Sequence, residues 1–403
     1  MILKDTLKQV VQSQKADLSS LELGVERESL KEMDLNLPHA LVISGVRRCG
    51  KSTLLRQLIK KTPRFCYFNF EDTRIEGFST TDFPKLDEAL QEDYGKCDYY
   101  FFDEIQNVPK WEIFVRSMLN KKKRFVITGS NASLLSKELG TRLTGRHVRH
   151  ELFPFSFKEM LLFTKQKPNI NSFDEYLKKG GFPDYLKFNR SEILMELLND
   201  ILARDIMVRH KLRESKTVRE MVVYLLSNVG KEFSYTSLKN MFGLGSTSTA
   251  VSFVSYFEDS YLLFSIPRFD YSLKKQLVNP KKVYSVDNGL SSVNSVSFSS
   301  DRGRMLENLV FLQLRRKDKE IFYFKGRKEC DFLVRQGNKI RGAFQVCYDL
   351  NEDNKDREIG GLVEAMNEFK LTEGYLLTYN QEDEFKIDEK KVIVKPVWEW
   401  LLE

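Results

Sequence analysis

Short apolar runs separated by amphipathic stretches dominate the first third of the chain. Four of these runs have the length and character of buried strands: 41–43, 65–70, 99–102 and 124–128. After the first run, residues 52–61 place Leu54, Leu55 and Ile59 on one face of a helix. Strands that alternate with helices in this way predict a parallel α/β sheet.

The rest of the chain changes its pattern twice. Residues 3–34 and 155–215 predict helices, the latter interrupted by a Gly-Gly-Phe-Pro turn at 180–183. Residues 217–283 show three amphipathic helical stretches followed by two strands, which is the order of a winged helix, a variant of the helix-turn-helix. From about residue 284 onward, strands and helices mix again.

Composition is that of a globular protein with several cores. The chain has 403 residues, 41% hydrophobic and 30% charged, which argues against a disordered or fibrous protein. No apolar run approaches about 18 residues, and the charged N-terminus does not resemble a signal peptide, so we expect no membrane association. The five cysteines form no CxxC pair, which favours a reducing, cytoplasmic location over disulfides or zinc.

The net charge of +7 is unevenly distributed. Residues 204–282 hold 13 basic and 7 acidic side chains, whereas residues 351–403 hold 7 basic and 14 acidic ones. A basic middle suggests a polyanionic partner such as DNA. A solvated charged surface explains the same numbers, so both interpretations stay open.

A phosphate-binding loop follows the first predicted strand. The segment from Gly45 to Ser52 matches GxxxxGK[ST], with an apolar strand before it and a helix after it. Glycines let backbone N–H groups surround phosphate oxygens, and the start of the helix favours an anion. The sequence therefore predicts an ATP site formed by Gly45, Arg47, Arg48, Cys49, Gly50, Lys51, Ser52 and Thr53.

Two acids follow the buried strand at 99–102. We expect Asp103, together with the Ser52 hydroxyl, to hold Mg²⁺, and Glu104 to polarise the attacking water. Lys51 would contact the β- and γ-phosphates. An adjacent glutamate favours hydrolysis over simple nucleotide storage.

These motifs resemble those of the predicted prokaryotic AAA+ ATPases that carry a C-terminal domain of unknown function. The resemblance runs from about residue 27 to 380, and it implies ATP binding, an AAA+ core, a winged-helix-like unit and a restriction-nuclease-like C-terminal fold. The matching stretches are SGVRRCGKSTLL, YFNFED, YYFFDEIQNVPKWE, ITGSNASLLS, LTGRHVRHELFPFSFKEM, GGFPDYL, ARDI, RGRMLENLVFLQLRR and ECDFLVRQ.

In ATPases of the AAA+ class, a sensor of the γ-phosphate sits after the fourth strand. Asn131 is the preferred candidate here, with Ser130 close behind. Arg142 or Arg146 would stabilise charge on the leaving phosphate, within one subunit or across a homo-oligomer. A plain surface position is the competing interpretation for each arginine.

Together, pattern and resemblance predict an α/β protein of four parts. These are an N-terminal helical segment at 1–35, a P-loop AAA+ ATPase domain with a helical lid at 36–215, a winged-helix-like domain at 216–283 and a restriction-nuclease-like α/β domain at 284–403.

The C-terminal part departs from an active nuclease. That chemistry needs an acid on a helix, then an aspartate and (E/Q)xK on a hairpin, to hold Mg²⁺ beside a phosphate. Candidate residues are Glu307, Glu329, Asp331 and Gln345. Cys347 stands where lysine is expected, so we expect a degenerate domain, although Lys325, Arg327 or Lys328 would offer a substitute charge.

The middle part carries hydroxyls and basic side chains that suit a DNA backbone. Residues 246–249 open the third helical stretch of this part, and hydroxyls there can contact phosphates. Basic residues lie in or near the expected wing: Arg268, Lys274, Lys275, Lys281 and Lys282. Packing against the ATPase core, or subunit contacts, would be the alternative role.

The leading hypothesis is a Mg²⁺-dependent ATPase that couples nucleotide state to a DNA-associated activity. One alternative is a slow ATP-dependent switch that scaffolds a protein partner without nucleic acid. Another is an ATP-gated nuclease.

Overall fold

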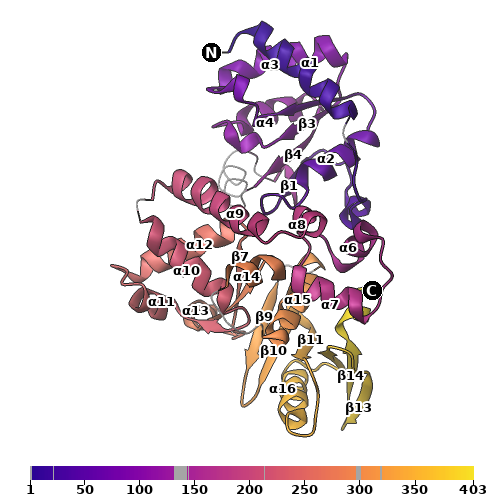
Figure 1. The fold of residues 1–403 in the computed structure, drawn as a ribbon, viewed down its shortest axis with the longest axis vertical. Helices are drawn as coiled ribbons and strands as arrows, with labels where there is room; N and C mark the ends of the chain where they lie inside the picture. The colour runs from indigo at the N-terminus through magenta and orange to yellow at the C-terminus, as the bar shows by residue number, and fades with distance from the viewer. Residues whose placement is uncertain are drawn as a thin grey trace. The chain divides into compact units, whose positions relative to one another are not determined.

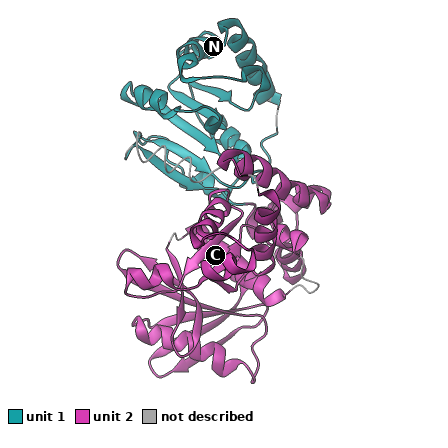
Figure 2. Ribbon diagram, turned by 90° about the vertical axis from the view of Figure 1, so that its left-hand side faces the viewer, with its two compact units in different colours: residues 1–153 teal, residues 154–403 magenta. Residues whose placement is uncertain are grey.

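The computed structural model describes residues 2–20, 22–130, 143, 145–212, 214–295, 301–317 and 320–403. Contacts within the chain define two compact units, 1–153 and 154–403 (Figure 2). The expected boundary after residue 35 falls inside the first unit, and those after residues 215 and 283 fall inside the second. No helix among the described residues is both long and apolar enough to cross a bilayer.

A five-stranded parallel sheet forms the centre of the first unit, in the order β2-β3-β4-β1-β5 (Figure 1). The strands are β1 Ala40–Ser44, β2 Phe65–Asn69, β3 Tyr99–Asp103, β4 Arg124–Gly129 and β5 His147–Glu151. The four strands expected from apolar runs are confirmed. Strand β5 lies at the edge of the sheet and has the polar sequence HVRHE, so it shows no apolar run that would predict it.

Helices and short 3₁₀ turns complete the first unit. The helices are α1 Lys4–Ser20, α2 Lys51–Lys60, α3 Phe83–Tyr94 and α4 Glu112–Asn120. The turns are η1 Glu28–Glu32, η2 Thr73–Ile75, η3 Thr80–Asp82 and η4 Ile105–Asn107.

The N-terminal helix belongs to the core of the first unit. Leu7, Val10 and Val11 of α1 are fully buried in one apolar cluster with Phe68 of β2 and Phe83 of α3. Their spacing of three and four residues puts them on one face of the helix. The region expected to be helical at 3–34 therefore contains α1 and η1, joined by a segment without regular structure.

The second unit begins with a run of helices. They are α6 Phe157–Thr164, α7 Ile170–Lys179, α8 Pro183–Phe188, α9 Glu192–Asp200 and the π-helical segment η5 Ile201–Val208. The expected turn separates α7 from α8. Gly180 ends α7 with a φ of 69°, and Pro183 starts α8, a position where its missing N–H costs nothing.

A small α/β part comes next, in the order helix, strand, helix, helix, strand, strand. Its elements are α10 Ser215–Ser227, β6 Glu232–Phe233, α11 Tyr235–Met241, α12 Thr247–Asp259, β7 Leu263–Pro267 and β8 Lys281–Ser285. A short helix, α13 Leu273–Val278, lies between β7 and β8. The strands form an antiparallel sheet in the order β6-β8-β7.

The C-terminal part is a mixed six-stranded sheet in the order β13-β14-β12-β11-β10-β9. Its strands are β9 Ile321–Lys325, β10 Glu329–Gln336, β11 Lys339–Cys347, β12 Glu373–Thr378, β13 Asp383–Ile387 and β14 Lys390–Pro396. The helices are α14 Asn288–Asn294, α15 Arg302–Lys317, α16 Lys355–Glu368 and α17 Val397–Trp400.

The two sheets of the second unit are joined at one edge. Arg268, just after β7, forms a parallel bridge with Tyr323 of β9, and the N–H of Phe269 donates to the Tyr323 carbonyl at 2.8 Å. Phe269 also packs edge-to-face against Phe322 and Phe369. The chain between β7 and β8 is therefore anchored to the C-terminal sheet at its start.

Candidate functional site

The loop between β1 and α2 can be built only with glycine at two positions. A Cβ on Gly45 would lie 2.1 Å from the carbonyl oxygen of Leu152. Gly50 precedes α2 with a φ of 102°, in the left-handed region that other residues avoid. The chain thus turns tightly from a buried strand into a helix, and the first N–H groups of α2 are left to bind an anion.

Lys51 lies over this loop. Its ammonium donates to the carbonyls of Gly45 at 3.1 Å and Val46 at 3.2 Å, and it lies 3.9 Å from Glu104 Oε1. The lysine is only 5% exposed, so its charge is held beside the loop rather than in solvent. A short movement of a flexible side chain would carry it to a phosphate in the loop.

Strand order brings the acid pair and the end of β4 together. Strand β4 lies between β1 and β3, so its last residues sit between the loop and the two acids. The Thr128 hydroxyl donates to Asp103 Oδ1 and accepts from the backbone N–H of Glu104 at 3.0 Å. Thr128 is completely buried. One side chain thereby orients both acids, a role that no sequence motif indicates.

Asp103 is a buried carboxylate whose environment suits a divalent cation. Its side chain accepts hydrogen bonds from Thr128, from Ser52 and, at 3.4 Å, from the Tyr67 hydroxyl. Burial and the neighbouring charge of Glu104 raise the pKa of Asp103. A hydroxyl and a carboxylate are hard oxygen ligands, so Ser52 and Asp103 fit Mg²⁺.

A cavity of about 250 Å³ opens beside these two residues. Its wall includes Ser52, Asp103, Arg56, Tyr67 and Gln14. Gln14 comes from α1, where its amide donates to the Asn69 carbonyl at 3.1 Å. The N-terminal helix therefore contributes to the wall next to the candidate Mg²⁺ ligands.

Arg27 supports the loop from behind and was missed by sequence reasoning. Its guanidinium donates to the carbonyl of Cys49 at 2.8 Å and to that of Phe153 at 2.7 Å. The side chain is 3% exposed. Arg27 precedes the loop in the chain by more than twenty residues, so spacing alone offered no signal for this contact.

The remaining loop residues lie around the same turn. Arg47 is 3.4 Å from the carboxylate of Glu71, and Arg48 is exposed with a φ of 63°. Cys49 is buried, which raises the pKa of its thiol. The Thr53 hydroxyl accepts from Arg56 at 3.0 Å.

The candidate sensor and arginines are only partly described. Ser130 is buried at the end of β4, close to the acid pair. Arg146 is exposed ahead of β5 and donates to Asn120. Asn131 and Arg142 lie outside the described residues.

The C-terminal acids converge on a lysine that was expected in the wing. The Lys282 ammonium lies 2.7 Å from Glu329, 2.8 Å from Asp331 and 3.4 Å from Glu307. Lys282 is 3% exposed, so it is not available to contact DNA. That part of the expected wing was wrong, because β8 turns the side chain into the acid cluster.

A distortion of β10 and a glutamine help to hold this cluster. The pairing of β10 with β9 shifts between Cys330 and Leu333, which re-aims Asp331. The Asp331 N–H donates to Gln345 Oε1 at 3.1 Å, and Asp331 Oδ2 accepts from the Val346 N–H at 3.0 Å. Gln345 is thus part of the cluster, as expected.

Charge in this cluster is balanced internally. Burial opposes the charge of Lys282, but Asp331 and Glu307 outweigh it and raise the pKa of the lysine well above its ordinary value. Burial raises the pKa of Glu307 to about 7, although Lys282 works in the opposite direction. The Tyr284 hydroxyl donates to Glu307 at 2.6 Å. Among the described residues, no three His, Cys, Asp or Glu side chains are grouped so that they could hold a metal ion.

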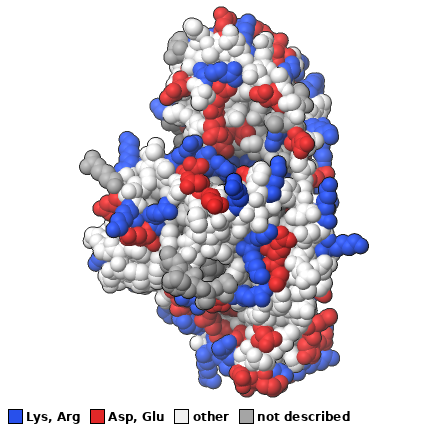
Figure 3. Space-filling model, viewed as in Figure 1, with Lys and Arg blue, Asp and Glu red and all other residues white. Residues whose placement is uncertain are grey.

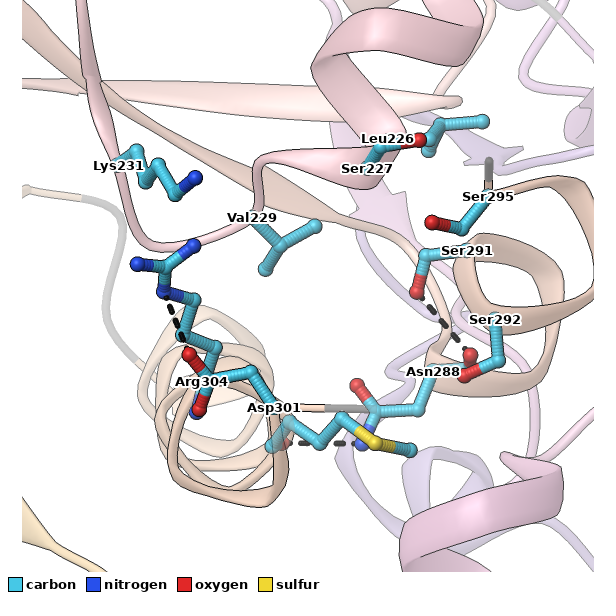
Figure 4. A pocket seen from close by; sticks show the side chains of 11 residues that line it. Leu226, Ser227, Val229, Lys231, Asn288, Ser291, Ser292, Ser295, Asp301 and Arg304 are labelled. Carbon is cyan, nitrogen blue, oxygen red and sulfur yellow. Dashed lines mark hydrogen bonds and ion pairs between the residues drawn. The ribbon is translucent and has the colours of Figure 1, made fainter. Parts of the chain in front are cut away.

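A larger cavity of about 290 Å³ lies elsewhere in the second unit (Figure 4). Lys231 and Arg304 line it together with Asn288 and a group of serines, and Arg304 pairs with Asp301 at 3.0 Å. None of the residues of the phosphate loop or of the acid cluster lines this cavity.

Comparisons with known proteins place the chain in a class. The family model for an AAA domain matches residues 38–161, the stretch that contains the loop, the acid pair and Thr128. A model for a domain of unknown function (DUF8612) matches residues 170–298. The domain of unknown function was expected at the C-terminus, whereas this match covers the middle of the chain.

Two full-length relatives define the family. The uncharacterized protein MJ1544 of Methanocaldococcus jannaschii is 35% identical, over 96% of this chain and 94% of its own length. An uncharacterized protein of Haemophilus influenzae is 30% identical, over 90% of this chain and 94% of its own length. The chain belongs to the same family as these proteins, and it carries an AAA domain.

Solved structures add little to this assignment. Caenorhabditis elegans PCH-2 matches with a TM-score of 0.23 and 17% identity, over 61% of this chain and 69% of its own. Saccharomyces cerevisiae Hsp104 in a casein complex matches with a TM-score of 0.30 and 12% identity, over 67% and 60%. TM-scores this low carry no argument about the fold.

Proposed function

We propose that the protein is a Mg²⁺-dependent ATPase. The observation that carries this proposal is the meeting of Lys51, Ser52, Asp103 and Glu104 at the ends of β1 and β3, with Thr128 of β4 between them. Each has the chemistry that phosphoryl transfer to water requires, and the AAA-domain match covers all five positions.

The roles follow from the contacts. The phosphates bind the N–H groups of the loop, and Lys51 exchanges its carbonyl partners for β- and γ-phosphate oxygens. Ser52 and Asp103 would hold Mg²⁺, which supplies charge neutralisation when it is bound. Glu104 accepts a hydrogen bond from the attacking water and takes its proton.

Steady-state ATP hydrolysis with Mg²⁺ tests this assignment. We expect Lys51→Ala to lose most nucleotide affinity or turnover, and Glu104→Gln to bind ATP but hydrolyse it at least about 100-fold more slowly, the scale of general base catalysis. Lys60→Ala, at the exposed end of the same helix, is the matched control. Normal turnover by Glu104→Gln would show that another base acts.

Arg146 is a candidate for a charge that completes the site. Its exposed position suits contact with a neighbouring subunit in a homo-oligomer. Arg146→Ala should then lower kcat without weakening ATP binding, and the specific activity of the native chain should rise with protein concentration. Activity independent of both would leave Arg146 as a surface residue.

A second candidate function is DNA association by residues 216–283. Its support is the order helix, strand, helix, helix, strand, strand, with Lys274 and Lys275 exposed between the last two strands. The hydroxyl of Ser246, expected to be free for phosphate, instead caps α12 by accepting from the Thr249 N–H at 3.1 Å. Basic and acidic side chains are interspersed on the face shown in Figure 3, which favours contact with few phosphates.

Salt dependence separates this function from a switch that binds a protein partner. Binding of duplex DNA should weaken steeply with salt, and Lys274→Ala with Lys275→Ala should reduce the slope of log K against log salt by about two. The paired control is Lys339→Ala with Lys386→Ala on the C-terminal sheet, both exposed. An ATPase rate indifferent to DNA, without binding at low salt, favours the protein-partner switch.

A further inference from the structure

The acid pair leads directly into a turn whose backbone is held on both sides. Glu104 has φ 51° and ψ 42°, in the left-handed region, and η4 Ile105–Asn107 starts directly after it. Ile105 is fully buried, and the Asn107 amide donates to the Phe70 carbonyl at 3.3 Å. These two anchors fix the backbone of Gln106 within the turn.

The side chain of Gln106 contacts the carboxylate of Glu104. Its amide nitrogen donates to Glu104 Oε2 and lies 3.4 Å from the hydroxyl oxygen of Ser130. The other carboxylate oxygen, Oε1, is the one that lies 3.9 Å from Lys51. The two oxygens of Glu104 thus have different partners, one on the phosphate loop and one on the turn.

These two partners differ in what ATP would do to them. Lys51 is expected to leave Glu104 for a phosphate, because an ammonium binds phosphate oxygens strongly. The amide of Gln106 has no such competitor, and its two N–H groups can hold Glu104 and Ser130 at once. After ATP binds, Gln106 is the side chain that keeps the Glu104 carboxylate in one orientation and couples it to the end of β4.

We propose that Gln106 is the positioning residue of the catalytic glutamate. This inference rests on the proposed ATPase function and adds to it a residue that neither the phosphate-loop motif nor the acid pair indicates. General base catalysis depends on placement of the base within hydrogen-bond reach of the water, and misplacement by about 1 Å can cost about 100-fold in rate.

Gln106→Met is the direct test, because methionine keeps the length of the side chain and removes the donor. We expect kcat to fall at least about 10-fold, while KM and the affinity for ATP stay within about twofold. Asn107→Ala is the matched control, since it removes the neighbouring contact of the same turn without touching Glu104. A loss shared equally by both variants would show that only the turn matters and would overturn the proposal.

A double-mutant cycle separates positioning from general damage. In a Glu104→Gln background, Gln106→Met should cause no further loss of kcat, because there is no longer a base to position. Gln106→Glu, which replaces the donor with a like charge, should be at least as slow as Gln106→Met. Additive losses, or native kcat in Gln106→Met, would overturn the proposal.

The two proposals fail differently. Full turnover by Glu104→Gln would reject Glu104 as the base and with it the proposed mechanism. A slow Glu104→Gln together with a native Gln106→Met would leave the ATPase site in place and reject only the role of Gln106.

Discussion

At the scale of single residues, Lys282 shows how a charge is kept inside the molecule. Three carboxylates surround its ammonium, and β8 brings the lysine to them from a different sheet. A buried ion can persist only when opposite charges and hydrogen bonds offset the lost hydration. The lysine is therefore part of the fold of the second unit, where it stands at the centre of the expected nuclease-like acids.

Lys282→Met should destabilise the second unit by about 3–5 kcal/mol, because it leaves buried carboxylates without their counter-charge. Calorimetry of the full chain measures the shift of the unfolding transition. Lys325→Met is the control, since its partner is Glu232 at 2.7 Å and the lysine is 43% exposed, and it should cost under about 1 kcal/mol. Equal shifts in the two variants would mean that the cluster contributes no more than a surface pair.

Glu307 predicts a dependence of stability on pH. Its pKa is raised to about 7 in the folded chain, above its ordinary value of 4.5, so the folded state holds a proton that the unfolded state has lost. The contribution of Glu307 is fully present below about pH 4.5 and is lost as pH rises through about 7, a change of at most about 3 kcal/mol.

Glu307→Gln should therefore flatten the decline in unfolding free energy between about pH 4.5 and 7. Thermal unfolding at a series of pH values measures this slope. Glu389→Gln, at an exposed position, should leave it as in the native chain. An unchanged slope in Glu307→Gln would show that other groups set the pH dependence.

At the scale of elements, the N-terminal helix is the part whose role the structure changed most. The sequence predicts only a separate helical segment at 1–35. In the structure, α1 supplies buried residues to the core of the first unit and a wall to the cavity beside Asp103. The AAA-domain match begins only at residue 38, after this helix has ended.

Leu7→Ala should destabilise the first unit by about 2–5 kcal/mol, because Leu7 is fully buried and its loss leaves a cavity. Leu3→Ala, 73% exposed, is the control and should change stability by under about 0.5 kcal/mol. Hydrogen exchange of amides in β1 and β3 reads the first unit alone. Unchanged protection in Leu7→Ala would show that α1 is dispensable for this core.

Element positions were predictable where one local property decides them. Strands β1 to β4 are apolar because both sides of each are covered, and the loop before α2 is marked by glycines that its geometry demands. The polar edge strand β5 and the shift in β10 were not predictable, because pairing with a distant partner decides them.

At the scale of the whole molecule, the two compact units predict a localised response to nucleotide. The proposed ligands of ATP all belong to residues 1–153. A ligand at 100 times its Kd stabilises the state that binds it by about 2.7 kcal/mol. Hydrogen exchange of the full chain with a non-hydrolysable ATP analogue should therefore slow in β1, β3 and β4.

The same experiment should leave β10 and β11 of the second unit close to their exchange without nucleotide. Lys51→Ala, which loses the phosphate contact, is the control and should show no slowing in either unit. Equal slowing throughout the native chain would mean that the second unit also responds to ATP.

The sequence by itself determined what depends on neighbours in the chain. The phosphate loop, the acid pair Asp103 and Glu104, the buried strands and the turn at 180–183 are local patterns with local physical causes. Only the tertiary structure decided which side chains support them. Thr128, Gln106, Arg27 and Lys282 act through burial and through contacts with residues brought close by the fold, and these are properties that no spacing along the chain encodes.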